Sequence, residues 1–508
     1  MSNVAEFYKD KTVFITGGTG FVGVTLIEKL LRCCPGLKNI YLLMRPKKGK
    51  QIEERLEDIK KNSVFNRLKE ENKSHLFEKL IPVAGDVGEE KLGLSSADRL
   101  TLVEVVQVVF HSAASLDFEA DLKTAGNINL LGTRRVVELC HEIRDLKALV
   151  HVSSAYVNSD ISNVEDRVYP APVDVKNVLK LIEEEDQAKV KAESAEMLKG
   201  CNHPNPYTLT KNLAEHEVLK GHVRAAIVRP SMITGAWKEP VPGWTISKNG
   251  PQGFLMGASK GVVRRLPVAK NLIYDYIPVD IVVNNLIVAA YAVERDATSK
   301  VKVYHCTSST TNPFRWELIE HLINSYLHRY PLRSAVWYPH LKLLPSLLMF
   351  RISAIFVHIF PAYILDTITR LSGGRPILVR LHTNVNNSLE RLERFIFNEW
   401  KFHNQQTRQL HKSLSAEDKE LFNLDIKELV WADYFIELTQ GVRTYLSNES
   451  PKSLEKARTK DKILMCVHLG LQATVLGLIW WLCKCLLATT WLKSSFIVVL
   501  TYFLMEQI

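Results

Sequence analysis

Short apolar runs and longer amphipathic stretches alternate along the first half of the chain. The apolar runs lie at residues 13–15, 39–44, 80–84, 105–110, 148–152 and 225–228, with amphipathic stretches such as 24–32 and 129–144 between them. Continuous apolar runs are typical of strands that are buried on both faces of a sheet. Their alternation with helix-length segments predicts an α/β fold built on a doubly wound parallel sheet.

The turn after the first predicted strand is rich in glycine, with Gly17, Gly20 and Gly23 in a G-x-x-G-x-x-G spacing. Residues without Cβ let the backbone approach a pyrophosphate, whose charge then meets the N–H groups at a helix start. An ordinary tight turn can contain the same glycines, but the strand and helix around this one favour a Rossmann-like dinucleotide-binding unit. The predicted cofactor contacts here are Thr16, Gly17, Gly20, Phe21, Val22 and Gly23.

The ends of the next predicted strands carry further candidate contacts. Arg45 follows the second strand, where an acidic residue would bind the ribose 2′-hydroxyl of NAD. A guanidinium there suits a 2′-phosphate, which we interpret as a preference for NADPH; the alternative is a solvated basic loop. Asp86 and Val87 follow the third strand, where an Asp can reach an adenine amine. Ala113 and Ala114 follow the fourth, where small residues let the chain pass under the ribose.

A Tyr-x-x-x-Lys pair lies downstream, at Tyr207 and Lys211, and on a helix both side chains share one face. A phenol has a pKa of about 10, and a neighbouring ammonium favours the phenolate. We therefore predict that Tyr207 is the proton donor and that Lys211 is its electrostatic partner and a ribose contact. Ser154, after the fifth strand, is the predicted hydrogen-bond donor to a substrate carbonyl, with Ser153 as the alternative.

Composition limits the other function classes. The chain has 508 residues, 46% of them hydrophobic, which predicts two or three domains. The formal charge of +10 permits anionic partners, but no basic arm or nucleic-acid motif is present, so we expect no nucleic-acid partner. Eight cysteines without framework spacing fit a reducing compartment, and Cys201 is interpreted as structural. His111 has no second residue at ligand spacing, so we expect it to be packed or hydrogen-bonded and expect no metal site.

These motifs together resemble the extended short-chain dehydrogenase/reductase superfamily and, more closely, the fatty acyl-CoA reductases. The resemblance covers nearly the whole chain and departs from the family at Ser153-Ser154, where Ser-Thr is usual, and at Ser112, where a small apolar residue is common. The segments that carry it are residues 16–23, 43–46, 85–87, 110–114, 151–158, 207–211 and 228–231, followed by 242–244, 249–251, Gly257, 260–261 and 275–280.

The resemblance implies NADPH-dependent reduction of a long-chain acyl-CoA to a primary alcohol. The thioester would accept a hydride and expel CoA thiolate, and a second NADPH would reduce the resulting aldehyde, without a covalent cysteine. The expected divisions are a reductase domain at 1–290, a connecting segment at 291–354, a helical domain at 355–449, a basic linker at 450–462 and a membrane anchor at 463–505.

Two other functions are considered for the same residues. A sterol or nucleotide-sugar dehydrogenase would keep the fold, but the additional C-terminal domain disfavours it. A membrane-tethered nucleotide-binding scaffold would not need the Ser154, Tyr207 and Lys211 set.

Lys260, Arg264 and Arg265 are either contacts for CoA phosphates or a solvated helix face. The sequence leaves open chain-length preference and whether the protein forms a homo-oligomer.

Three apolar segments concern membranes. Residues 352–365 are too short to span a bilayer, which needs about twenty residues, and are expected to be buried core, with an acyl-channel wall or an interfacial helix as alternatives. Residues 463–483 are long enough to span a bilayer as a helix, with a buried core helix as the alternative. Residues 494–505 would be re-entrant or half of a hairpin. Lysines and arginines at 452–462 predict a cytosolic catalytic domain on the endoplasmic reticulum or peroxisomal membrane, although no peroxisomal Ser-Lys-Leu terminus is present.

Overall fold

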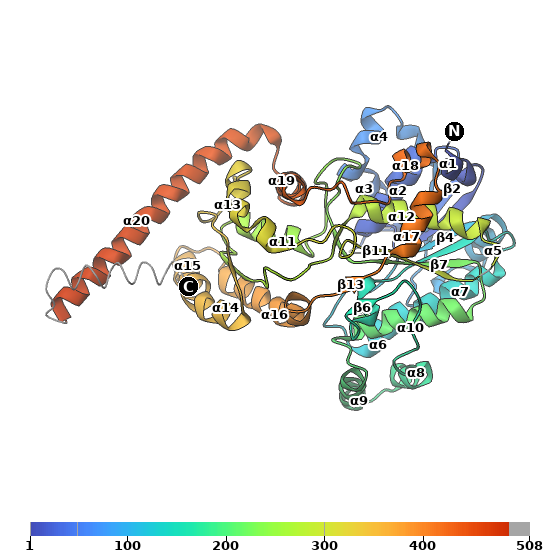
Figure 1. Ribbon diagram of the computed structural model, residues 1–508, viewed down its shortest axis with the longest axis horizontal. Helices are drawn as coiled ribbons and strands as arrows, with labels where there is room; N and C mark the ends of the chain where they lie inside the picture. The colour runs from blue at the N-terminus through green and yellow to red at the C-terminus, as the bar shows by residue number, and fades with distance from the viewer. Residues whose placement is uncertain (1, 48, 299, 487–508) are drawn as a thin grey trace. The chain divides into compact units, whose positions relative to one another are not determined.

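The computed structural model describes residues 2–47, 49–298 and 300–486. The chain divides into two compact units, each built from separate stretches of sequence (Figure 1). The sheet unit runs from the N-terminus to Ser247 and is completed by Ile273–Phe314 and Glu399–Val430. The helical unit contains Lys248–Leu272, Arg315–Asn398 and the chain from Trp431 onwards. The predicted hairpin segment 494–505 lies outside the described residues.

The sheet unit is organised around seven parallel strands in the order β11-β7-β5-β4-β1-β2-β3. The chain starts at β1 in the middle, builds outward to β3, returns to β4 and continues to the other edge, which is the doubly wound arrangement. The strands are β1 (Thr12–Thr16), β2 (Asn39–Met44), β3 (Leu80–Ala84), β4 (Val108–His111), β5 (Ala148–Val152), β7 (Ala225–Pro230) and β11 (Lys302–Cys306).

Helices cover both faces of this sheet. On one face, α5 (Ser96–Val105), α7 (Gly132–Glu142) and α10 (Pro206–Lys220) contribute to one apolar cluster, in which Leu102, Val136 and Val218 pack with strand residues. On the other face, α12 (Val279–Arg295) contacts α2 (Phe21–Cys33) and lies against β5 and β7. The predicted fold class is confirmed.

The strand register brings the functional segments to one edge of the sheet. Thr16 is the register partner of His111, and His111 is the partner of His151. The glycine turn, the segment after β4 and the serines after β5 therefore all leave the sheet at its carboxyl edge. Ligands of open α/β sheets bind at this edge.

Smaller elements complete the sheet unit. Two short strand pairs, β10–β8 and β13–β6, are parallel, and β13 belongs to the stretch that returns after residue 399. The elements are α1 (Asn3–Tyr8), α3 (Ile52–Lys60), α4 (Asn66–Glu70), α6 (Leu122–Ala125), α8 (Val175–Glu183), α9 (Gln187–Gly200), α17 (Gln405–Ser413), α18 (Ala416–Leu421), β6 (Asn163–Val164), β8 (Met232–Thr234), β10 (Tyr276–Pro278) and β13 (Lys401–Phe402).

The helical unit contains a short parallel pair, β9 (Arg265–Pro267) with β12 (Lys342–Leu344), and otherwise helices. Its helices are α11 (Pro251–Ser259), α13 (Glu320–Arg329), α14 (Leu347–Ala354), the π-helical segment η7 (Ile355–Ile359), α15 (Phe360–Leu371), α16 (Leu378–Ile396), α19 (Trp431–Gly441), the π-helical segment η8 (Val442–Leu446) and α20 (Leu454–Leu486).

Two segments of the helical unit are long and apolar enough to cross a membrane. The most apolar 18 residues of Pro451–Leu482 have a mean hydropathy of 1.9, and 6% of them are buried. In Leu347–Leu371 the corresponding 18 residues have a mean hydropathy of 1.8, and 33% of them are buried. The first contains most of the predicted span at 463–483. The second overturns an expectation, because Ile352, Phe356 and Phe360 are exposed and not part of a buried core.

The strand predictions differ from the structure at two points. Residues 105–110 were expected to be one strand, but Val105 ends α5 and β4 begins only at Val108, because the apolar run continues across a helix end. The seventh strand, β11, lies inside 291–354, which the sequence predicted as a connecting segment. β11 pairs with β7 and forms the edge of the main sheet.

Candidate active site

The glycine turn between β1 and α2 is closed by backbone contacts that exclude side chains. Gly17 has a φ of +76°, and a Cβ there would lie 2.7 Å from the backbone N of Ala113. A Cβ on Gly23 would lie 2.2 Å from the Gly17 carbonyl oxygen. Gly20 precedes the first turn of α2, and its position has no side-chain cap. A glycine-rich turn at a helix N-terminus is the arrangement that binds a pyrophosphate, so the turn fits the predicted dinucleotide.

Thr16, at the end of β1, ties this turn to the neighbouring strand. The Thr16 hydroxyl is 2.7 Å from His111 Nδ1 and accepts a hydrogen bond from the Ala113 N–H at 3.2 Å. The other ring nitrogen of His111 lies 3.0 Å from the hydroxyl of Thr133. Burial and the charge of Lys211 lower the pKa of His111 to about 3, which keeps the ring neutral. The prediction that His111 is packed and hydrogen-bonded is confirmed.

The predicted adenosine-side residues form a second group at the same edge. Arg45, after β2, makes an ion pair of 2.9 Å with Asp86, after β3. The guanidinium is 59% exposed and Asp86 also accepts the Gly88 N–H at 2.9 Å. The carbonyl of Val87 accepts a hydrogen bond from Arg135 at 3.0 Å. An exposed cation thus stands at the end of β2, where it is paired with the carboxylate that follows β3.

Ser154 and Tyr207 are brought together by β5 and α10. α10 begins at Pro206, and the side chain of Asn205 caps it by accepting the Thr208 N–H at 3.0 Å. This start places Tyr207 in the first turn, where it forms a hydrogen bond with Ser154. Burial raises the pKa of Tyr207 to about 12, although the bond with Ser154 lowers it. The phenol is therefore protonated at neutral pH.

Lys211 lies one turn further along α10 and is almost fully buried. Its Nζ donates to the carbonyl oxygen of Val152, the last residue of β5, at 2.6 Å. Burial lowers the pKa of Lys211 to about 8, while the carboxylate of Glu215 raises it. The pKa of Tyr207 is shifted by burial and by its hydrogen bond with Ser154. The structure thus brings Ser154, Tyr207 and Lys211 to one edge.

A buried ion pair that the sequence analysis missed lies beneath these residues. Glu215 accepts two hydrogen bonds from Arg229, at 2.7 and 2.5 Å, and both side chains are at most 1% exposed. Ser153 donates to the same carboxylate at 2.5 Å, so Ser153 is engaged here while Ser154 meets Tyr207. The sequence did contain one indication of Glu215: it lies four residues after Lys211, which puts the two side chains on one helix face.

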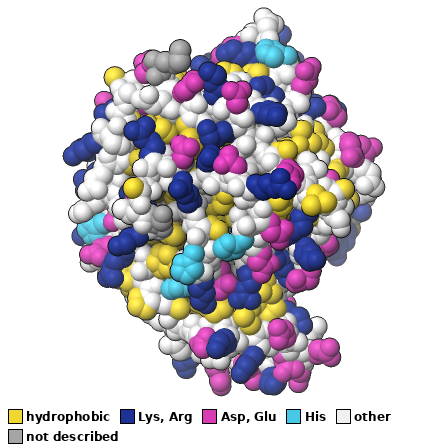
Figure 2. Space-filling view, turned by 90° about the vertical axis from the view of Figure 1, so that its right-hand side faces the viewer, with side chains coloured by type: hydrophobic (Ala, Val, Ile, Leu, Met, Phe, Trp, Pro, Cys, Tyr) yellow, Lys and Arg dark blue, Asp and Glu magenta, His cyan; other side chains and the backbone are white. Residues whose placement is uncertain are grey.

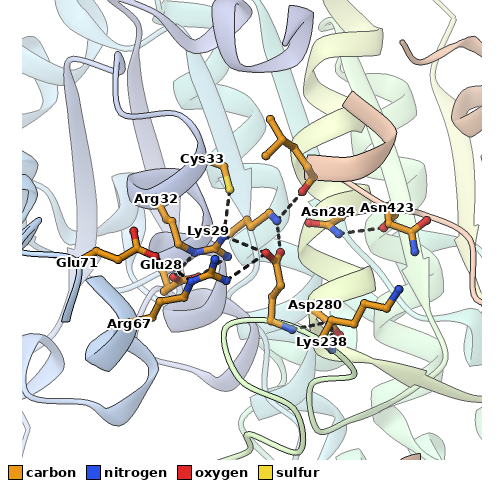
Figure 3. A network of polar contacts seen from close by, with 12 residues as sticks. Glu28, Lys29, Arg32, Cys33, Arg67, Glu71, Lys238, Asp280, Asn284 and Asn423 are labelled. Atoms are coloured by element: carbon orange, nitrogen blue, oxygen red, sulfur yellow. Dashed lines mark hydrogen bonds and ion pairs between the residues drawn. The ribbon is translucent and has the colours of Figure 1, made fainter. Parts of the chain in front are cut away.

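A second polar cluster fixes the loop after β8 (Figure 3). Glu239 is bonded to Lys29 and to Arg32, the latter at 3.0 Å, and both cations come from α2. Burial alone would raise the pKa of Glu239, but these charges outweigh it and lower the pKa. Asp280, on α12, accepts the backbone N–H groups of residues 237–239 at 2.8 to 3.1 Å. The loop is thereby fastened to the helix that begins at the glycine turn.

The same loop ends at Trp244, which packs on the predicted cofactor contact Phe21. The two rings are stacked with centroids 5.6 Å apart and an interplanar angle of 28°. The Trp244 indole N–H also donates to the hydroxyl of Ser63 at 3.0 Å. Trp244 is fully buried and fixes the side chain at the first residue of α2. The sequence analysis noted Trp244 only as part of the family-like segments.

Charge is distributed rather than gathered on the face shown in Figure 2. Lysine and arginine side chains there are interspersed with aspartate and glutamate. Ion pairs such as Arg99 with Glu142 at 2.6 Å and Arg144 with Glu104 at 2.6 Å fit this pattern. Among the described residues, no group of three or more His, Cys, Asp or Glu side chains could hold a metal ion.

Comparisons with known proteins agree along the whole chain. Two family models, both described as male sterility protein, match residues 15–286 and 357–449, and the first is an NAD-binding domain. The chain is 53% identical to a putative fatty acyl-CoA reductase of Drosophila melanogaster over 99% of each protein. It is 35% identical to fatty acyl-CoA reductase 1 of Xenopus laevis, covering 94% of this chain and 93% of that protein.

Solved structures show the same fold at low sequence identity. The terminal reductase domain of the myxalamid biosynthetic pathway has a TM-score of 0.56 at 18% identity and covers 87% of this chain and 91% of that one. A reductase domain of a non-ribosomal peptide synthetase from Mycobacterium tuberculosis has a TM-score of 0.55 at 17% identity, covering 86% and 92%. The parallel sheet and the helices around it are thus an arrangement already seen in reductase domains.

Proposed function

Because this chain belongs to the fatty acyl-CoA reductase family, an alcohol-forming group of oxidoreductases, we propose that it reduces a long-chain fatty acyl-CoA to the primary alcohol with NADPH and releases CoA. The observation that carries this proposal is the hydrogen bond between Ser154 and Tyr207 beside the buried Lys211. These three side chains lie at the carboxyl edge of the sheet that also presents the glycine turn.

Each of the three residues has a role that follows from its environment. NADPH supplies the hydride. Negative charge then develops on the substrate carbonyl oxygen, and Ser154 is positioned to donate a hydrogen bond to it. Tyr207, protonated because its pKa is raised to about 12, donates the proton that the oxygen needs. With a pKa of about 8, Lys211 is mostly an ammonium at neutral pH and stabilises the phenolate that remains.

The reaction needs this chemistry at two successive carbonyls. Reduction of the thioester gives a tetrahedral adduct that expels CoA thiolate and leaves an aldehyde, and reduction of the aldehyde gives the alcohol. Ser154 serves both carbonyls, whereas the proton from Tyr207 is required for the alcohol oxygen. Ser153, held by Glu215, fixes the chain just before Ser154. The Glu215–Arg229 pair also places a carboxylate one helical turn from Lys211, where it favours the charged amine.

The proposed cofactor is NADPH because of Arg45. An exposed guanidinium at the end of β2 can make charge-assisted hydrogen bonds to a 2′-phosphate, which NADH lacks. Thr16, Gly17, Gly20, Phe21, Val22 and Gly23 would hold the pyrophosphate region, Asp86 and Val87 the adenine, and Ala113, Ala114 and Lys211 the ribose beside the nicotinamide. The close backbone contacts of Gly17 and Gly23 support this assignment, since they leave no room for a side chain at these two positions.

We also propose that α20 anchors the protein in the endoplasmic reticulum or peroxisomal membrane with the catalytic unit in the cytosol. The apolar part of α20 is exposed along its length, at residues such as Val467, Leu471 and Leu478. Basic residues at 452–462 precede it, and basic flanks remain on the cytosolic side. An anchor of this kind suits an enzyme whose substrate and product carry long alkyl chains.

Microsomes that contain the full chain test the proposal directly. With palmitoyl-CoA and NADPH, they should form hexadecanol, detected by mass. The Tyr207→Phe variant should lose alcohol formation by a factor of about 10² to 10⁴ and still bind NADPH, because only the donated proton is removed. Tyr41→Phe is the matched control, since Tyr41 is a partly buried tyrosine on β2 that has no role in the proposed reaction. Release of CoA without aldehyde or alcohol, or a Tyr207→Phe variant with full activity, would contradict the proposal.

A further inference from the structure

The exposed apolar face of α14, η7 and α15 is not explained by catalysis or by folding. Along this continuous helical segment, large apolar side chains recur three or four residues apart, which places them on one side. Ile352, Phe356, Phe360, Tyr363, Ile364 and Ile368 each leave between 45% and 65% of their surface exposed. Soluble proteins rarely expose contiguous apolar surface of this extent unless it binds something.

α16 packs along this segment (Figure 1) and contacts it through positions that are not among the exposed apolar ones. Arg351, on α14, forms an ion pair of 2.8 Å with Glu390, near the far end of α16. Asp366, on α15, accepts the backbone N–H groups of Ile377, Leu378 and Val379 at 2.8 to 3.0 Å, at the start of α16. Contacts at both ends mean that α16 runs antiparallel along the segment.

This pairing excludes a bilayer-spanning arrangement, although Leu347–Leu371 is long enough for one. α16 would have to cross the bilayer with its partner, and it carries Arg380, Glu390, Arg391, Glu393 and Arg394. Charged side chains at the centre of a bilayer cost about 3 kcal/mol each on insertion scales. The segment is therefore two-sided, with an apolar face on one side and a charged helix on the other.

We propose that α14, η7 and α15 lie in the plane of the membrane surface, with their apolar face in the lipid of one leaflet and α16 on the water side. An amphipathic helix with one apolar face and a charged opposite side binds membranes in this way. This membrane contact does not depend on the reaction proposed above.

The charges of this segment point to anionic lipid as the partner. Between residues 347 and 381 the chain has four arginines, at 351, 370, 375 and 380, and a single acid, Asp366. Arg370, Arg375 and Arg380 are exposed, while Asp366 is already satisfied by backbone N–H groups. Lysine and arginine near a membrane surface are attracted to anionic headgroups by about 1 kcal/mol each. The helical unit also contains α20, the membrane anchor proposed above, and insertion of α20 would bring this unit to a bilayer.

Spin labels on the full chain can distinguish the two sides of the segment. In a background with Cys201, Cys466, Cys483 and Cys485 replaced by serine, single labels are placed at Phe356→Cys and Ile364→Cys on the apolar face. The matched control is Asn387→Cys, an exposed position on α16. The protein is reconstituted in vesicles of phosphatidylcholine with phosphatidylserine, and collisions with dissolved oxygen and with a water-soluble nickel chelate are measured.

We expect the labels at 356 and 364 to collide with oxygen several-fold more often than with the nickel chelate. The label at 387 should collide more often with the nickel chelate. Equal nickel access at all three positions would overturn it. Spin–spin broadening at 356 that disappears when unlabelled protein is added would instead assign the face to a second copy of the chain. Protection that appears only on adding palmitoyl-CoA would assign it to an acyl chain. Unchanged melting temperatures confirm that the labelled variants are folded.

Discussion

Tyr207 and Lys211 are both buried, and burial moves their pKa values in opposite directions. A neutral phenol and a neutral amine are the forms that a low-dielectric site favours, so the pKa of Tyr207 rises to about 12 and that of Lys211 falls to about 8. The consequence is a phenol that keeps its proton until the substrate oxygen takes it. The pKa of the Lys211 amine is close enough to neutral pH for the amine to exchange protons there.

Because the pKa of Lys211 is lowered in the folded protein, the free energy of unfolding should depend on pH. An unfolded lysine titrates near 10.5 and the folded one near 8, so between these values the unfolded chain binds more protons and stability rises with pH. The wild-type free energy of unfolding should gain about 3 kcal/mol relative to Lys211→Met from pH 8 to pH 10.5, since each pKa unit is worth about 1.4 kcal/mol. Denaturation of the purified proteins in detergent at several pH values measures the difference. Parallel pH curves for the two proteins would show that Lys211 titrates normally.

Arg45 carries the proposed choice between the two nicotinamide cofactors. Arg45→Ala should lower kcat/KM for NADPH by about tenfold, because hydrogen bonds to charged groups contribute about 1.5–3 kcal/mol and this side chain is exposed. The value for NADH should change by less than about twofold. Arg144→Ala, which removes another exposed and ion-paired arginine, serves as the control. Equal losses with both cofactors would mean that Arg45 does not contact the 2′-phosphate.

At the scale of elements, the glycine turn depends on contacts that only a missing Cβ allows. In a Gly23→Ala variant the new carbon would lie 2.2 Å from the Gly17 oxygen and 2.6 Å from Gly18 Cα, and both are backbone atoms that cannot move aside separately. We expect at least a tenfold weaker Kd for NADPH and a stability loss of about 1–3 kcal/mol, as for other overpacked sites. Gly200→Ala, where a Cβ meets nothing within 4 Å, should change neither. Titration calorimetry and thermal melting provide both readouts.

The elements that sequence reasoning found are those whose signal is local. Six strands of the sheet were predicted because a strand buried on both faces is a continuous apolar run. β11 was missed since it is a five-residue edge strand, Lys302–Cys306, in which polar and apolar residues are mixed. Motif spacing likewise placed Ser154, Tyr207 and Lys211 near one another. The Glu215–Arg229 pair could not be found this way, because it depends on how α10 packs on β7.

Apolar character alone also could not distinguish a buried helix from one that faces lipid. The run at 352–365 was expected to be core because it is apolar and too short to span a bilayer, whereas the structure exposes large apolar side chains on it and pairs it with α16. The distinguishing information is the partner helix, and α16 is separated in sequence by the Gly373–Gly374 turn. The longer run in α20 was recognised because its length exceeds what a core helix needs.

At the scale of the whole molecule, two apolar surfaces of different kinds predict two different modes of membrane attachment. α20 has the length of a spanning helix, and a spanning helix resists extraction with alkaline carbonate. The segment of α14, η7 and α15 would contact only one leaflet, and such interfacial contacts are removed by carbonate but survive neutral buffer. The full chain should therefore remain in the carbonate pellet. In sealed microsomes, protease added outside should digest the sheet unit, because that unit is proposed to face the cytosol.

Charged residues introduced into α20 should distinguish attachment by the spanning helix from attachment by the interfacial segment. A variant with Leu471→Arg and Leu478→Arg loses about 5–7 kcal/mol of insertion free energy, since each central arginine costs about 2.5–3.5 kcal/mol. It should move to the carbonate supernatant and yet stay with the membranes at neutral pH through the interfacial segment. The matched control, Leu471→Ala with Leu478→Ala, keeps the helix apolar and should stay in the pellet. If the arginine variant left the membrane at neutral pH as well, the apolar face of α14, η7 and α15 would have failed to hold the protein, which would contradict the proposed interfacial contact.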